Sequence, residues 1–289
     1  MNGKHIKQHL NKKLEDWLLS IDNEDVKKAI KENVIITGGA LVSLLTGDEV
    51  KDYDVYFKDK EALKIVAQYY ADKWNKKKGY TEATITEDEK ERVRIFISSK
   101  GVAGKADEDD IDLNSGEEFA ESEKPKKKEK EKYYPKFLTS NAITLSDKIQ
   151  VVIRFYGDVN EIHKNYDYVH CTCAWCSWDN ELILPSRALE AIINKELFYM
   201  GSQYPLCSIF RARKYINRGY HINAGQYLKM AMQLNDLDLK NIEVLKDQLM
   251  GVDSAYMSML INAIAEQKEK DENFEIDSHY VIELVNRIF

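Results

Sequence analysis

The chain has 289 residues, of which 44% are hydrophobic and 31% are charged, and its formal net charge is −7. This length allows one large domain or two modest domains with real cores, and the negative charge argues against a general nucleic-acid coat protein. No apolar run is long enough to cross a membrane, and residues 1–10 are too polar for a signal peptide, so a soluble, cytoplasmic protein is expected. The four cysteines do not form a disulfide framework, and reduced thiols are expected.

Two helices are predicted at the start of the chain. Ile6, Leu10 and Leu14 recur at helical spacing, and Asn23 is a suitable N-cap for a second, short helix. Both helices are expected to pack on the outside of a sheet.

Residues 34–57 predict a strand, a glycine turn, a helix and a second strand. The β-branched run at residues 34–36 stops at Gly38 and Gly39, where a chain can turn sharply or let a ligand approach its backbone. The helix that follows directs the N–H groups of its first turn towards the glycines, which favours an anion such as phosphate. Ser43 lies one turn further on and could add a hydroxyl group.

The second strand of this segment carries two aspartates at alternate positions. Asp52 and Asp54 therefore project to one face, while Tyr53 and Val55 project to the other. Two neighbouring carboxylates repel one another unless a cation lies between them, and their oxygen atoms suit Mg²⁺ or Mn²⁺. An ordinary βαβ turn followed by a strand with two solvated aspartates is the alternative.

The glycine pair and the carboxylate pair together resemble the signature of the polymerase-β-like nucleotidyltransferase superfamily. The matching residues are Thr37-Gly38-Gly39 and Asp52-Tyr53-Asp54-Val55. The superfamily includes CCA-adding enzymes, poly(A) polymerases, aminoglycoside nucleotidyltransferases and toxins, and the chain also resembles nucleotidyltransferase-like proteins of tailed bacteriophages. The resemblance implies transfer of an NMP from an NTP with Mg²⁺ or Mn²⁺, and a third carboxylate on a later strand.

Residues 60–97 predict an amphipathic helix at 60–78 and a hairpin formed by residues 80–86 and 92–97. Residues 101–132 differ, because an acidic block is followed by a mostly basic one and apolar residues are few. We interpret about 101–133 as a disordered charged insertion. Nucleic-acid binding by its lysines and metal binding by its carboxylates are the alternatives.

Two further strands are predicted at residues 149–156 and 166–175, with a short helix at 159–163 between them. Asp167 begins the second of these strands on a largely apolar face, so it is the candidate for the third, metal-binding carboxylate. A turn or cap aspartate is the alternative. His170, Cys171, Cys173 and Cys176 raise a zinc hypothesis, although their spacing is poor for a zinc site and buried cysteine is the ordinary alternative.

The chain changes to helices from residue 185, with predicted helices at 187–198, from 205, and at 222–234, 239–249, 254–266 and 279–289. Arg211, Lys214 and Arg218 have helical spacing and would form a cationic stripe. The stripe is similar to the arginine-bearing helix of CCA-adding enzymes, which implies contact with nucleotide phosphates or RNA. A solvated helix face is the alternative.

Together these features predict an α+β fold, with a nucleotidyltransferase-like mixed sheet and flanking helices at residues 1–184 and a helical domain at 185–289. The predicted function is metal-dependent transfer of an NMP to a hydroxyl of RNA (including tRNA), a protein or a small molecule. The alternatives are a phage structural or interaction protein that keeps the fold without catalysis, and a toxin-type transferase. The expected location is the host cytoplasm if a phage encodes the chain, and association with the virion is also compatible.

Overall fold

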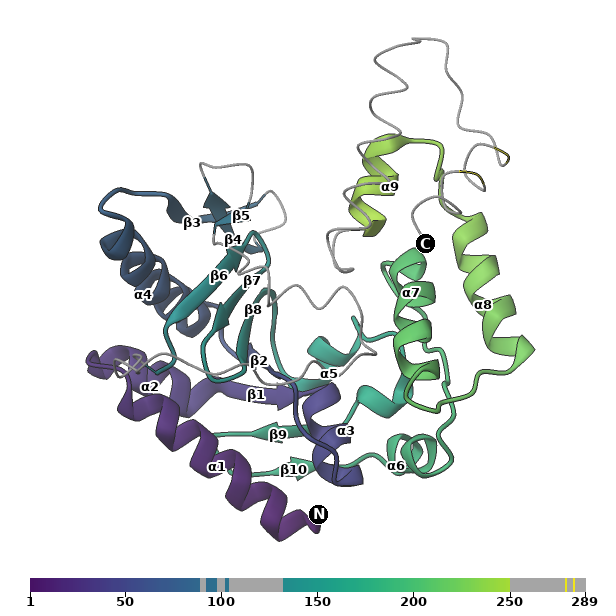
Figure 1. Cartoon of the computed structure of the whole chain (residues 1–289), viewed down its shortest axis with the longest axis horizontal. Helices are drawn as coiled ribbons and strands as arrows, with labels where there is room; N and C mark the ends of the chain where they lie inside the picture. The colour runs from purple at the N-terminus through teal and green to yellow at the C-terminus, as the bar shows by residue number, and fades with distance from the viewer. Residues whose placement is uncertain (89–91, 98–101, 104–131, 250–278, 280–282, 284–289) are drawn as a thin grey trace, which may run out of the picture. The chain divides into compact units, whose positions relative to one another are not determined.

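The computed structural model describes residues 1–88, 92–97, 102–103, 132–249, 279 and 283 (Figure 1). Within these residues the fold is α+β, with helices flanking an eight-stranded mixed sheet and a separate two-stranded hairpin. The predicted fold class is therefore confirmed. The expected charged insertion at about 101–133 and the expected helices at 254–266 and 279–289 fall almost entirely outside the described residues.

The chain divides into two compact units. The first consists of Met1–Lys164 and His170–Ile192, and the second of Asn165–Val169 and Ile193–Phe289. Residues 165–169 thus belong to the second unit although the stretches on both sides belong to the first. Each unit is described by itself below.

The two predicted N-terminal helices are present as α1 (Gly3–Leu19) and α2 (Glu24–Asn33). The α1 face that carries Ile6, Leu10 and Leu14 is buried, as its helical spacing predicts. Asn23 caps α2 by accepting hydrogen bonds from the backbone N–H groups of Asp25 and Val26. The element that follows is β1 (Val34–Thr37).

The central sheet has the strand order β10-β9-β1-β2-β8-β7-β6-β5. The pair β2–β8 is parallel, and the other six pairs of neighbouring strands are antiparallel. Its strands and connecting helices in chain order are β1, α3 (Gly39–Thr46), β2 (Tyr53–Phe57), α4 (Lys60–Lys78), β5 (Val102–Ala103), β6 (Pro135–Thr139), β7 (Ala142–Leu145), β8 (Ile149–Tyr156), α5 (Val159–His163), β9 (Ala174–Cys176) and β10 (Leu182–Ile183). The strand predicted at 149–156 is confirmed as β8, which lies between β2 and β7.

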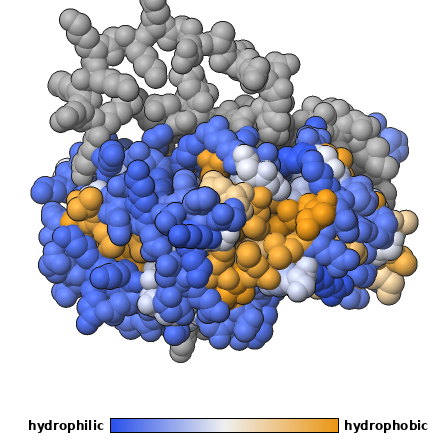
Figure 2. All heavy atoms as spheres, turned by 90° about the horizontal axis from the view of Figure 1, so that it is seen from below, coloured by the Kyte–Doolittle hydropathy of each residue, from blue (hydrophilic) through white to orange (hydrophobic). Residues whose placement is uncertain are grey.

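The predicted hairpin is confirmed as β3 (Ala83–Glu87) paired antiparallel with β4 (Val93–Ile97). The predicted helices at 60–78 and 159–163 are α4 and α5. Among the described residues, no helix combines the length and the apolar character needed to cross a membrane. The surface in Figure 2 is largely hydrophilic, with hydrophobic residues gathered in patches.

The strand predicted at residues 166–175 is wrong in its first part. A 3-10 helix, η1 (Val169–Cys171), occupies the middle of this stretch, and only β9 at its end is a strand. The N–H of Val169 donates to the carbonyl of Phe198, and the carbonyl of Asp167 accepts from the N–H of Met200. These bonds pair residues 167–169 with a loop of the second unit, so tertiary contacts override the strand propensity of the sequence.

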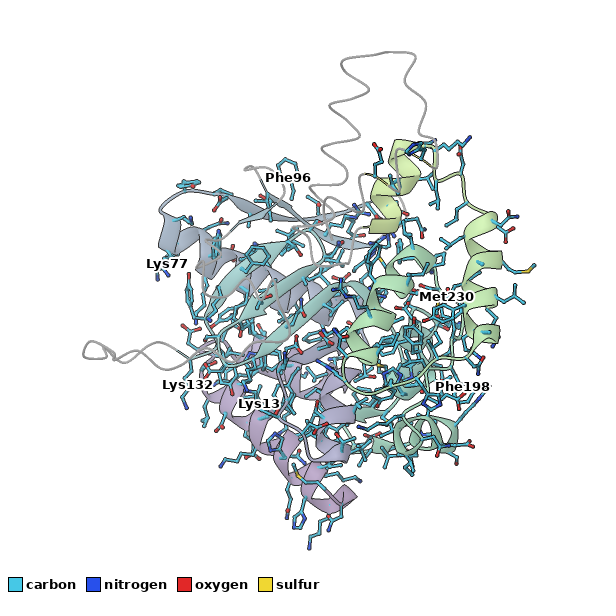
Figure 3. All side chains as sticks on the ribbon, turned by 45° about the vertical axis from the view of Figure 1, so that its right-hand side comes forward. Lys13, Lys77, Phe96, Lys132, Phe198 and Met230 are labelled. Carbon is cyan, nitrogen blue, oxygen red and sulfur yellow. The ribbon has the colours of Figure 1, made fainter. Side chains whose placement is uncertain are left out.

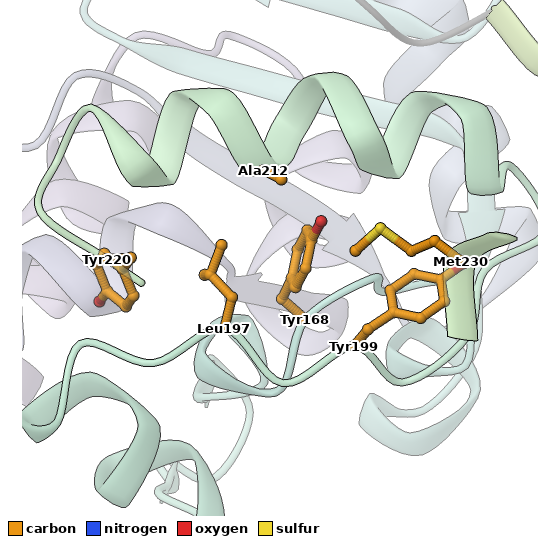
Figure 4. Packing of buried hydrophobic residues seen from close by; sticks show 6 residues of the cluster. All are labelled: Tyr168, Leu197, Tyr199, Ala212, Tyr220 and Met230. Carbon is orange, nitrogen blue, oxygen red and sulfur yellow. The ribbon is translucent and has the colours of Figure 1, made fainter. Parts of the chain in front are cut away.

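The second unit contains three described helices after α6 (Ser186–Ile193), most of which lies in the first unit: α7 (Pro205–Ile216), α8 (Ala224–Asn235) and α9 (Ile242–Leu249). Helix α6 ends at Ile193 and is therefore shorter than the helix predicted at 187–198. Lys195 takes a left-handed conformation with φ of 49°, which stops the helix. Met230 on α8 packs against buried residues of the second unit (Figure 4). Figure 3 labels Met230 and Phe198 among the side chains of the chain. The full cluster is Tyr168, Leu197, Tyr199, Ala212, Tyr220 and Met230.

Candidate nucleotide and metal site

The glycine turn between β1 and α3 has the conformation that its sequence requires. Gly38 has φ of 79° and ψ of −142°, a region open essentially to glycine alone, and α3 begins at the next residue. The carbonyl of Gly38 accepts hydrogen bonds from the N–H groups of Leu41 and Val42. A methyl group added at Gly39 would meet no atom within 4 Å, so a ligand has room to approach the backbone there.

The carboxylate pair lies beside this turn. In the antiparallel pair of β1 and β2, Thr37 is opposite Asp54, so the end of β1 that leads into Gly38 adjoins the beginning of β2. Asp52 is exposed and Asp54 is half-buried, while Tyr53 and Val55 are buried on the other face. The alternation of Tyr53, Asp54 and Val55 is as the sequence predicts, but β2 begins at Tyr53, so Asp52 directly precedes the strand instead of lying on it. The glycine turn and both carboxylates lie at one end of the two strands.

A hydrogen-bonded threonine–histidine pair lies next to Asp54, and the sequence did not point to it. Thr37 is fully buried, and its hydroxyl lies 2.8 Å from the carbonyl oxygen of Cys173 and 2.8 Å from Nε2 of His163. A carbonyl can only accept, so the hydroxyl proton goes to Cys173, and Nε2 of His163 donates to the threonine oxygen. Nε2 therefore carries a proton, and in the neutral form of the ring Nδ1 is the unprotonated nitrogen.

Burial also keeps His163 neutral. It lowers the pKa of the imidazole to about 4, from the ordinary value of 6.5. His163 belongs to α5, and its partner Thr37 lies 126 residues earlier in the chain. The only local signal in the sequence was the short helix itself, which gives no indication of what its last residue contacts.

The two carboxylates have the chemistry of a divalent-cation site. Among the described residues, no group of three or more His, Cys, Asp or Glu side chains is close enough together to hold a metal ion by itself. Mg²⁺ is commonly bound by one or two carboxylates together with substrate phosphates and water, rather than by a complete cage of protein ligands. Asp52 and Asp54, next to a glycine turn that a phosphate can approach, fit this mode of binding.

Asp167, the third candidate carboxylate, lies in the second unit and is buried. Its two oxygens have different partners. The hydroxyl of Ser202 donates to Oδ1 at 2.8 Å, and Nη1 of Arg211 forms a short ion pair with Oδ2. The structure thus brings together two candidate residues, Asp167 and Arg211, that had been assigned to different tasks.

The other members of the predicted cationic stripe are placed differently. Lys214 is exposed on α7, whereas Arg218 lies beyond the last residue of that helix. The continuous stripe predicted along one helix face is therefore reduced to Arg211 and Lys214. Ser43 lies within α3 and is partly exposed.

The four cysteines all lie within the described residues, where they are buried and form no disulfide. Burial raises the pKa of Cys173 and of Cys176 to about 12, so both are neutral thiols at physiological pH. Sγ of Cys171 lies 3.3 Å from Nε2 of its neighbour His170. The cysteines behave as small buried side chains.

The fold and the site define an α+β protein whose mixed sheet carries a glycine turn beside a pair of carboxylates. The chain belongs to the Gabija anti-defense 2 family (Gad2), whose sequence profile matches residues 8–195. It is 23% identical over 257 residues to a protein named Gabija anti-defense 2 from Bacillus phage SPbetaL7. That match covers 88% of this chain and 49% of the relative, so the chain spans about half the length of this relative.

Similar solved structures include CCA-adding enzymes. The Thermotoga maritima CCA-adding enzyme complexed with tRNA is 12% identical with a TM-score of 0.40, and the similarity covers 78% of this chain and 44% of that one. A CCA-adding enzyme in complex with CTP is also 12% identical with a TM-score of 0.40, over 78% of this chain and 43% of the other.

Proposed function

We propose that this chain is a metal-dependent nucleotidyltransferase that transfers an NMP from an NTP to a hydroxyl group and releases pyrophosphate. The observation that carries the proposal is the register of β1 and β2, in which Thr37 is opposite Asp54. This register brings together a ligand-accessible glycine turn and the two carboxylates that we propose to bind the metal. Phosphoryl chemistry needs these two parts together, because one holds the phosphates and the other holds the cation.

In this proposal the backbone at Gly38 and Gly39 and the hydroxyl of Ser43 hold the triphosphate, and Asp52 and Asp54 hold the metal. Bound Mg²⁺ or Mn²⁺ would supply charge neutralisation at the phosphate oxygens. The acceptor hydroxyl oxygen attacks the α-phosphorus in line, and a new P–O bond forms there. The bond from the α-phosphorus to the bridging oxygen breaks, pyrophosphate leaves, and the hydroxyl proton passes to a base.

Asp167 is proposed as that base or as a ligand of a second metal, and Arg211 and Lys214 are proposed to balance phosphate charge. Either role for Asp167 requires it to share or release the guanidinium of Arg211, which it binds in this structure. The charge of Arg211 would then become available to a phosphate. The acceptor is proposed to be a hydroxyl of RNA, with tRNA included, of a protein, or of a small molecule.

The biological role that we propose follows the name of the relative. Its match covers 88% of this chain, so we propose that this chain is also a phage protein that counteracts the Gabija defense system in the host cytoplasm. In this view nucleotidyl transfer would be the means of interference, and its acceptor would be a host component.

A second candidate is an interaction protein that retains the fold without catalysis. The observation that favours it is the engagement of both oxygens of Asp167, by Ser202 and by Arg211. A carboxylate held in this way stabilises the second unit and need not bind a metal. Such a protein would act by binding a host component.

The test is incubation of the purified protein with each labelled NTP, Mg²⁺ or Mn²⁺, and a lysate that contains RNA and protein. The control is the double variant Asp52→Ala, Asp54→Ala. Label transferred by the wild type alone would support the nucleotidyltransferase proposal. It would also reveal which NTP is used and which class of acceptor receives the label. No transfer, together with no metal-dependent NTP binding, would favour the interaction protein.

A further inference from the structure

Lys148, in the turn between β7 and β8, holds the loop that carries Asp52. Its Nζ donates to the backbone carbonyl of Val50 at 2.9 Å and to Oε1 of Glu49 at 2.6 Å. Its own carbonyl accepts from the N–H of Tyr53 at 2.7 Å. One residue therefore contacts the chain on both sides of Asp52.

This loop needs such a support, because it has no regular structure of its own. Helix α3 ends at Thr46 and β2 begins only at Tyr53, so Asp52 lies just outside the sheet. Asp54 is fixed by the sheet pairing on both sides of β2, whereas Asp52 is exposed. The distance between the two carboxylates therefore depends on how the loop before Tyr53 is held.

Tyr53, the first residue of β2, is held from the opposite face of the sheet. The hydroxyl of Tyr53 lies 2.6 Å from Nε2 of His9, and Nζ of Lys13 lies 5.2 Å from the centre of the Tyr53 ring. These contacts hold Tyr53 against α1. The loop before Tyr53 lies outside these contacts, and Lys148 binds it at Glu49 and Val50.

The backbone of Lys148 is also unusual. Its φ is 64°, and that of the preceding Asp147 is 61°, both in the left-handed region where residues other than glycine, asparagine and aspartate are uncommon. A glycine at position 148 would adopt this conformation without strain and would keep the carbonyl bond to Tyr53. It would lack the amine that reaches Val50. Strained residues of this kind concentrate at functional sites.

We propose that Lys148 is a positioning residue, which holds the loop before Tyr53 so that Asp52 stands at the right distance from Asp54 to share a divalent cation. The inference rests on the proposed function, because it assigns metal binding to that carboxylate pair. Lys148 touches neither the metal nor the substrate. Its effect passes through the carbonyl of Val50 and the backbone to Asp52.

The test compares Lys148→Met with Lys27→Met in the full chain. Both lysines form exposed ion pairs of similar length, Lys148 with Glu49 at 2.6 Å and Lys27 with Glu24 at 2.7 Å, and the glutamates are 85% and 84% exposed. Binding of Mn²⁺ with inorganic triphosphate is followed by electron paramagnetic resonance. Triphosphate carries no nucleobase, so this measurement does not depend on which NTP the protein uses. Amide hydrogen exchange of residues 48–53 reports on the loop.

We expect Lys148→Met to weaken Mn²⁺ binding about ten-fold, in the range that supporting residues of metal sites show. Exchange should rise at residues 48–53 and not elsewhere, and Lys27→Met should match the wild type in both measurements. Lys148→Arg should recover most of the affinity, because its guanidinium can reach the same carbonyl. Glu49→Gln should bind Mn²⁺ nearly as the wild type does, because the Val50 contact remains.

Wild-type Mn²⁺ affinity in Lys148→Met would overturn the positioning role while leaving the proposed function intact. Faster exchange throughout the first unit would also overturn it, because Lys148 would then support folding in general. A wild-type protein that binds no Mn²⁺ with triphosphate would overturn the proposed function and this role together.

Discussion

The partly buried His163 makes the stability of the protein depend on pH, and the replacement His163→Gln tests this. Burial lowers the pKa of His163 to about 4, so as the pH falls the unfolded chain takes up a proton at this residue before the folded chain does. The stability that comes from the neutral imidazole is therefore present in full above about pH 6.5. It is lost as the pH falls from about 6.5 towards 4.

The size of the effect follows from the two pKa values. A difference of about 2.5 units corresponds to at most about 3.4 kcal/mol between high and low pH. Between pH 7 and pH 5 the expected loss is about 2 kcal/mol, because at pH 5 the unfolded histidine is mostly protonated and the folded one mostly neutral. Glutamine does not titrate, and its side-chain amide can still donate to the hydroxyl of Thr37.

The measurement is urea unfolding of the wild type and of His163→Gln at pH 7 and pH 5, with His5→Gln as a control for the loss of an exposed imidazole. We expect the wild type to lose about 2 kcal/mol more of unfolding free energy than His163→Gln on acidification. An NMR titration of the His163 ring gives its pKa directly. Equal pH dependence in the two proteins would refute the assignment of a neutral His163 with a lowered pKa.

The glycine turn gives a second comparison. Gly38→Ala should destabilise the protein by about 1–3 kcal/mol, because φ of 79° with ψ of −142° strains alanine, whereas Gly39→Ala should leave the thermal melt unchanged, because the added methyl meets no atom. If phosphate approaches Gly39, then Gly39→Ala should still weaken NTP binding, and normal binding would contradict the proposed use of the turn. The variant Arg211→Met removes the cation and leaves buried Asp167 without this ion-pair partner, which should lower the free energy of unfolding by about 2 kcal/mol. This cost is less than for a fully buried pair, because the arginine side chain is 37% exposed. In urea unfolding, Asp167→Asn should lower the free energy of unfolding by less than Arg211→Met does. An equal or greater loss would show that Arg211 does not compensate the charge of Asp167.

The part of the site formed by consecutive residues could be predicted from the sequence. The β-branched run, the glycine pair and the alternation of Asp52 with Tyr53 are local patterns, because backbone conformation and the two-residue period of a strand decide them. The sequence therefore located β1, α3 and β2 and assigned Asp52 and Asp54 to one face. The register that sets Thr37 opposite Asp54 could not be predicted, since it depends on pairing across the sheet.

The contacts that complete each unit join residues far apart in the chain. His163 meets Thr37 across 126 residues, and Arg211 meets Asp167 across 44 residues. A spacing rule cannot find such pairs. The strand propensity of residues 166–175 was misleading for a related reason, because Tyr168 is buried in the core of the second unit, where its hydroxyl donates to the carbonyl of Ser208.

Asp54→Asn separates an enzyme from an interaction protein, because it removes a charge from the site and nearly preserves the shape of the side chain. If the carboxylate holds a catalytic metal, transfer should fall at least about 100-fold, since such a cation supplies several kcal/mol of charge stabilisation. The thermal melt should change little, because Asp54 is only half-buried. The same variant should lose protection of phage plated on cells that carry the Gabija system, if transfer is the means of interference. Full protection by Asp54→Asn at normal protein levels would contradict a catalytic mechanism, because binding alone would then suffice.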